Sequence, residues 1–175
     1  MTNKVLFILK RREDYSSVTH NKVGLSTGLY NSAKFMQEML VNSGIDSVLE
    51  IAIDNNDIDR LVTQHKPTHV IIEALWVTPT KFSVLIPLHP KVKWIIRLHS
   101  EMPFMAGEGM AMDWLGEYIK FPQVYIAANA PRMLDEVRAY LSNVVISDMN
   151  KKVIYLPNYY PQEYKPAKSK FKEPL

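Results

Sequence analysis

The sequence predicts an α/β domain with a doubly wound, mainly parallel sheet of about six strands. Short apolar segments alternate with helical patterns from the N-terminus to about residue 156. Most of these segments are continuously apolar, as in Val70-Ile71-Ile72, which is typical of strands that helices cover on both faces. A chain of 175 residues suffices for one such domain, whereas eight strand–helix units of a closed barrel need more.

The six predicted strands are apolar runs bounded by polar or turn residues: 4–10, 47–53, 68–75, 93–99, 123–128 and 152–156. The first contains five apolar residues between Lys4 and Lys10. That run is too short for a signal-peptide core or a membrane span, so we expect no membrane span and a cytoplasmic protein.

Five helices are predicted between the strands, where apolar residues recur at helical spacing: 27–43, about 56–66, 79–86, about 110–120, and from about 131 onward. Gly44 supplies a left-handed stop for the first helix. Thr78 and Pro79 predict an N-cap and a first helical residue, and Pro87 is expected to end the third helix.

The fold class predicts where a site would lie. Ligands of doubly wound sheets bind beyond the carboxyl ends of the strands, where the strand order reverses. With the order 3-2-1-4-5, the reversal falls between the first and fourth strands. Those strands precede the longest connections without a helical pattern, residues 11–26 and 100–109, so we expect these two loops to build a pocket.

The first loop ends in Gly24, Ser26, Thr27 and Gly28. Glycines let backbone approach a ligand, and the following helix N-terminus favours an anionic or hydroxyl-rich group. The segment is neither a P-loop nor a dinucleotide fingerprint. Its letters match a serine-hydrolase elbow, but the serine lies too far beyond the strand. The alternative interpretation is a turn capped by Ser26 or Thr27.

The second loop begins with His99 and Glu101, which are candidates for a general base or for partners of a sugar hydroxyl. The alternatives are a structural, hydrogen-bonded histidine and a solvated carboxylate. Asp113 opens the fourth helix beside Trp114, where both could line the mouth of the pocket. For Trp114 the alternative is packing in the core.

Two charges, Glu73 and Arg97, interrupt apolar strands near their carboxyl ends. A charge on a buried strand needs a partner or an exit to solvent. Two interpretations remain open: the side chains bind ligand in the crevice, or they form a structural pair or network.

Composition excludes several classes of function. The chain has no cysteine, so disulfides, thiolate metal ligands and a cysteine nucleophile are excluded. The five histidines show no short paired spacing, and no metal site is predicted. The net charge of +3 includes a lysine cluster in the tail, without a basic stripe and interleaved aromatics, so no nucleic acid partner is expected.

Seven segments carry a resemblance to a known family: 4–10, 24–40, 67–76 (PTHVIIEALW), 93–103 (KWIIRLHSEMP), 112–115, 126–133 and 153–160. In order and spacing, they make the chain similar to the N-terminal domain of GT-B glycosyltransferases, especially the glycosyltransferase-like proteins of bacteriophage genomes.

The resemblance implies a Rossmann-like acceptor-side domain over residues 1–160. Residues 161–175 would be a linker or tail leading to an absent C-terminal domain that binds a nucleotide-sugar donor. The complete enzyme would transfer a sugar to a hydroxyl of a small-molecule or glycan acceptor, with retention favoured, in the host cytoplasm if phage-encoded. This chain alone is expected to bind no cofactor and to be inactive.

The same resemblance implies roles for particular residues. The glycine loop (Gly24, Ser26, Thr27 and Gly28) and His99 would border the cleft near the transferred sugar. Asn129 and Asn158 would stand at the cleft edge or hinge. Two alternatives remain: a non-catalytic Rossmann-like binding module for a small ligand or host protein, and a flavodoxin-like domain that binds phosphate or flavin through Ser16, Ser17 and Thr19.

Overall fold

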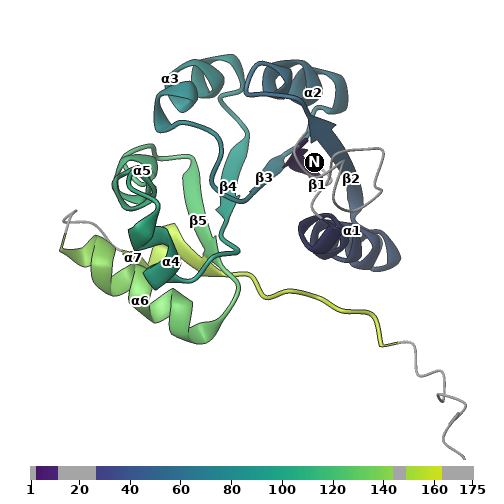
Figure 1. The fold of residues 1–175 in the computed structure, drawn as a ribbon. Coiled ribbons are helices and arrows are strands. Elements are labelled where there is room, and N and C mark those ends of the chain that lie inside the picture. The colour runs from purple at the N-terminus through teal and green to yellow at the C-terminus, as the bar shows by residue number, and fades with distance from the viewer. Residues whose placement is uncertain (1–2, 12–26, 144–148, 163–175) are drawn as a thin grey trace, which may run out of the picture.

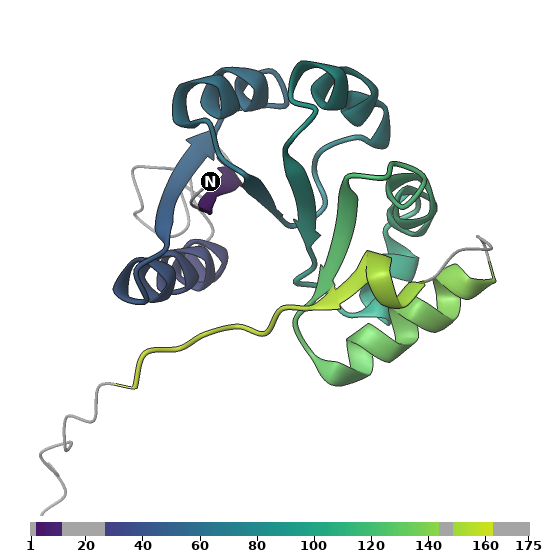
Figure 2. The ribbon, with the colours of Figure 1, turned by 180° about the vertical axis from the view of Figure 1, so that it is seen from behind.

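The computed structural model describes residues 3–11, 27–143 and 149–162. They form a six-stranded, entirely parallel sheet with helices on both faces (Figures 1 and 2), which confirms the predicted fold class. The strands are β1 (Lys4–Lys10), β2 (Asp46–Ala52), β3 (His69–Glu73), β4 (Lys93–Arg97), β5 (Val124–Ala128) and β6 (Val153–Tyr155).

The strand order is β2-β1-β3-β4-β5-β6, so the expected order 3-2-1-4-5 is wrong. β2 carries Asp46 and Glu50 and is mostly only partly buried, which suits an edge strand. β3 is buried almost throughout and needs a neighbour on each side. The reversal of strand order therefore lies between β1 and β3, and not between the first and fourth strands as predicted.

The helices are α1 (Thr27–Asn42), α2 (Asp57–His65), α3 (Pro79–Leu88), α4 (Met102–Gly107), α5 (Ala111–Tyr118), α6 (Pro131–Ser142) and α7 (Met149–Lys152). Of the described helices, α1 alone packs on one face of the sheet, where Met36 meets Phe7 and Ile71. The larger core on the opposite face joins the strands to α2, α3, α5 and α6.

Three helical details differ from the sequence prediction. Pro87 lies inside the last turn of α3, so the helix continues past the residue expected to stop it. Thr78 occupies the predicted N-cap position of α3, but its side chain makes no capping hydrogen bond. Residues 102–107 form the short helix α4 within a connection expected to be without helix. Gly44 has the predicted left-handed conformation, with φ of 79°.

Aromatic side chains fix α3 and α5 against the sheet. Phe82 packs edge-on against Trp94 of β4 and Tyr118 of α5, with ring centroids 5.6 and 5.7 Å apart. The buried Tyr118 hydroxyl donates a hydrogen bond to the carbonyl of Val77. These contacts hold the helices that flank the carboxyl ends of β3 and β4.

After β6 the chain runs back across the carboxyl edge towards α1 (Figure 1). Tyr160 packs edge-on against Phe35 of α1, with ring centroids 6.3 Å apart. The segment 156–160 thereby joins the two ends of the sheet. Within the part of the chain that the structure describes, no helix is long and apolar enough to cross a bilayer.

Candidate active site at the carboxyl edge of the sheet

A fully buried ion pair lies at the carboxyl ends of two central strands. Glu73 ends β3 and Arg97 ends β4, and the parallel register places them opposite one another. Nη1 of Arg97 donates to both carboxylate oxygens of Glu73, at 3.0 and 3.3 Å. Neither side chain is exposed. Because an unpaired buried charge is strongly unfavourable, each of these residues depends on the other.

His99 extends the ion pair towards solvent. Its Nε2 lies 2.5 Å from Oε2 of Glu73, and its side chain is 17% exposed, whereas Glu73 is not exposed at all. A carboxylate oxygen accepts hydrogen bonds, so Nε2–H is the donor in this contact, and Nδ1 is the ring nitrogen that Glu73 does not engage. An imidazole that a buried carboxylate orients in this way has the arrangement of a general base.

Arg97 also binds two segments that are distant in the sequence. Nη2 donates to Oδ1 of Asn158 at 2.7 Å and to the hydroxyl of Ser32 at 3.3 Å. The Ser32 hydroxyl itself donates to Oδ1 of Asn158 at 3.2 Å. The guanidinium therefore ties β4 to α1 and to the segment after β6. The position of Glu73, and through it that of His99, depends on this network.

Two other histidines in the described residues pair with carboxylates. His65 lies 2.7 Å from Glu50, and His89 lies 2.7 Å from Asp59. Their carboxylate partners are 30% and 49% exposed, so both pairs lie at the protein surface. His99 differs because its carboxylate partner, Glu73, is fully buried.

The backbone makes an unusual turn directly after Glu73. Ala74 has φ of 68°, a left-handed conformation that costs a non-glycine residue about 1–3 kcal/mol. Its N–H donates to the carbonyl of Arg97 at 2.9 Å, and Nε1 of Trp76 donates to the carbonyl of Glu73 at 3.0 Å. These bonds hold the strained turn in place beside His99. Strain of this kind is found most often at functional sites.

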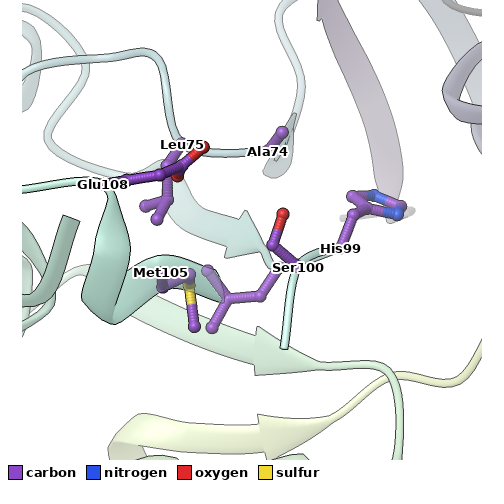
Figure 3. A pocket seen from close by; sticks show the side chains of 7 residues that line it. Ala74, Leu75, His99, Ser100, Met105 and Glu108 are labelled. Carbon is purple, nitrogen blue, oxygen red and sulfur yellow. The ribbon is translucent and has the colours of Figure 1, made fainter. Parts of the chain in front are cut away.

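A small pocket of about 70 Å³ lies between the segments that follow β3 and β4 (Figure 3). His99 and Glu108 lie on opposite sides of it, the imidazole of His99 is turned away from Glu108, and Ser100 contributes a hydroxyl. The volume accommodates a hydroxyl group with the carbon that carries it. It is too small for a whole ligand, since ligand pockets usually measure roughly 300–1,000 Å³.

The small pocket adjoins a larger groove of about 310 Å³. Leu75 and Glu108 line both spaces, and Met110, Ala111 and Trp114 complete the groove. A ligand could therefore place one group beside His99 and its remaining part along the start of α5.

Comparison of the sequence with protein-family models and with curated proteins finds no match. Within the described residues, no group of three potential metal ligands is arranged to hold an ion.

The structure places the other predicted site residues around this edge. Gly24 and Ser26 lie outside the described residues. Thr27 and Gly28 open α1, one turn before Ser32. A Cβ added at Gly28 would meet no atom within 4 Å, so packing in the described structure does not require a glycine there.

The remaining predicted residues lie outside the hydrogen-bonded network. Glu101 is exposed at the start of α4 and faces α6, where the hydrogen bond and charge of Glu136, and then the charge of Glu101, raise the pKa of Arg132. Asp113 is exposed in the first turn of α5. Asn129 follows β5 and is half-buried, and no hydrogen bond among the described residues connects it to the network.

Sequence reasoning singled out neither Ser32 nor Ala74, and it covered Ser100 and Glu108 only within the loop 100–109. Ser32 is four residues before the buried Met36 and therefore lies on the same side of α1, a spacing that could have identified it. Ala74 gave no signal, because glycine or asparagine is the residue expected at a positive φ.

Proposed function

We propose that this chain forms the acceptor side of a glycosyltransferase and that His99 is its general base. The observation that carries the proposal is the exposed edge of an imidazole whose Nε2 is held by the fully buried Glu73. The pocket beside it has room for one acceptor hydroxyl. The resemblance to the GT-B N-terminal domain supplies the reaction class.

In the proposed step the acceptor hydroxyl gives its proton to Nδ1 of His99. Its oxygen forms a bond to the anomeric carbon of a nucleotide-sugar as the bond to the diphosphate breaks. The nucleoside diphosphate leaves with the electron pair. Glu73 stabilises the resulting imidazolium, and Arg97 holds the Glu73 carboxylate in position. We assign donor binding to a second domain, as the resemblance implies.

The proposal is tested on the full-length gene product with UDP-glucose, UDP-N-acetylglucosamine and GDP-mannose as donors and a panel of alcohols and glycosides as acceptors. Release of nucleoside diphosphate is expected to fall by roughly 10²–10⁴-fold in His99→Gln, the usual contribution of a general base. The matched control is His65→Gln, which removes the partly exposed pair of His65 with Glu50 and is expected to leave turnover unchanged.

Equal activity of the two variants, or no turnover with any donor, overturns the proposal. The anomeric configuration of the product then separates two mechanisms. In-line displacement with a base inverts that configuration, whereas the resemblance favours retention.

A second candidate has one specific observation in its favour. The order β2-β1-β3-β4-β5 is that of flavodoxin-like domains, which bind flavin at the reversal between the first and third strands. A binding module of this kind would hold a small ligand at the same edge without needing a base. Quenching of FMN fluorescence by the chain, undiminished in His99→Gln, would favour it over the glycosyltransferase.

A further inference from the structure

The groove beside the active-site pocket has a composition that selects among ligands. In the part of the chain that the structure describes, no lysine or arginine lines either the pocket or the groove. Glu108 is the carboxylate that lines both. A phosphate or a nucleotide diphosphate would meet this carboxylate without a cation to offset the repulsion. The lining therefore disfavours anionic ligands and suits a neutral, hydroxyl-rich one.

Trp114 gives the groove an aromatic wall. It lies in α5, is half-buried, and packs against Tyr118 with ring centroids 6.4 Å apart at an interplanar angle of 71°. Tyr118 is itself fixed by its hydrogen bond to Val77. The indole is therefore held on a rigid support and loses little conformational entropy when a ligand packs against it.

Two further features set the shape of the groove. Gly109 adopts a left-handed conformation, with φ of 60°, between Glu108 and Met110. This turn brings the carboxylate and the start of α5 to the same groove. The hydroxyl of Tyr140 donates to the carbonyl of Met112 at 3.2 Å and fixes α5 against α6.

We propose that this groove is a subsite for a neutral sugar ring and that the acceptor is therefore a glycan or glycoside. The C–H face of a pyranose would pack on the indole of Trp114, and ring hydroxyls would donate to Glu108. A neighbouring hydroxyl would reach the small pocket beside His99. The groove volume of about 310 Å³ lies within the range of small-molecule sites. This assignment rests on the proposed function, because it names the substrate class of the same site.

The test uses the three tryptophans of the chain as reporters. Trp94 is fully buried, and the indole N–H of Trp76 donates to the backbone carbonyl of Glu73. Each indole signal in a ¹⁵N–¹H spectrum therefore reports a different environment. The probes are methyl β-D-glucopyranoside, methyl β-D-galactopyranoside and methyl α-D-mannopyranoside. At least one of these glycosides is expected to shift the Trp114 signal, with a millimolar Kd and little change at Trp94.

Variants separate the groove from the surrounding surface. Trp114→Ala is expected to raise the Kd by roughly tenfold, the contribution of a well-packed aromatic ring. For this variant, binding is followed by saturation transfer to the glycoside. The matched control is Phe104→Ala, which removes an aromatic side chain that is 63% exposed on α4 and lines neither space. It should leave the Kd unchanged.

An anionic sugar tests the effect of the Glu108 carboxylate on ligand charge. Glucose 6-phosphate is expected to bind at least about fivefold more weakly than the glucoside, and Glu108→Gln should narrow that difference. Absence of binding by all three glycosides overturns the subsite, as does equal loss in Trp114→Ala and Phe104→Ala or tighter binding of the phosphate.

These outcomes are distinct from failure of the proposed function. Transfer that depends on His99 but uses only acceptors without a sugar ring would overturn the subsite alone. Glycoside binding without transfer that depends on His99 would overturn the proposed reaction and leave a sugar-binding site.

Discussion

Removing one charge of the Glu73–Arg97 pair is expected to lower the free energy of unfolding strongly, because it leaves the other charge buried and unpaired. Both side chains are fully buried, and Nη1 of Arg97 donates to both oxygens of Glu73. Glu73→Leu leaves a buried guanidinium without its counter-charge, and breaking such a pair costs about 3–5 kcal/mol. Because a domain is typically stable by only about 5–15 kcal/mol, the variant should be close to unfolding.

Arg97→Met is expected to cost a similar amount, because the Glu73 carboxylate then keeps only His99 as a partner. In the double variant no buried charge remains, so the loss should be no more than about 3 kcal/mol. The two single effects therefore should not add, and the coupling free energy between the positions should be at least about 3 kcal/mol.

Urea unfolding followed by circular dichroism measures these free energies. Lys34→Met is the matched control, since it removes a lysine from an exposed pair with Glu38, 3.7 Å apart. With side chains 45% and 48% exposed, that pair should contribute less than about 0.5 kcal/mol. Single charge removals at Glu73 or Arg97 that cost no more than the control, or strictly additive effects, would refute the reasoning.

Three further predictions concern stability. Burial raises the pKa of Tyr118. The contribution of Tyr118 to the free energy of unfolding is therefore complete below pH 10 and is lost as the pH rises beyond it. Tyr118→Phe should remove that alkaline loss from the urea midpoint, and an unchanged pH profile would contradict this. Burial, and to a lesser extent the charge of Lys93, lower the pKa of His69. The contribution of His69 to the free energy of unfolding is therefore present above pH 6.5 and is lost as the pH falls. The stability of His69→Gln should therefore decline less between neutral and mildly acidic pH, and a steeper decline would count against burial as the cause. Ala74→Gly should raise the free energy of unfolding by up to about 1 kcal/mol, since glycine adopts the left-handed φ of 68° without strain. A lower Tm for this variant would show that the turn is not strained.

The secondary structure was predictable because its causes are local. Continuous apolar runs such as Val70-Ile71-Ile72 predicted buried strands, and Gly44 predicted the end of α1. The same local pattern showed that Glu73 and Arg97 carry charges near the ends of buried strands. It did not predict α4, because a helix of six residues has too few turns to show a period.

Only the tertiary structure decided which strands are neighbours and which charges meet. Glu73 and Arg97 are 24 residues apart, and Ser32 and Asn158 are separated by 126 residues. Their contacts follow from the order of the sheet and from the return of the chain across its carboxyl edge. No short-range pattern encodes these features, because they depend on the packing of elements that are distant in the sequence.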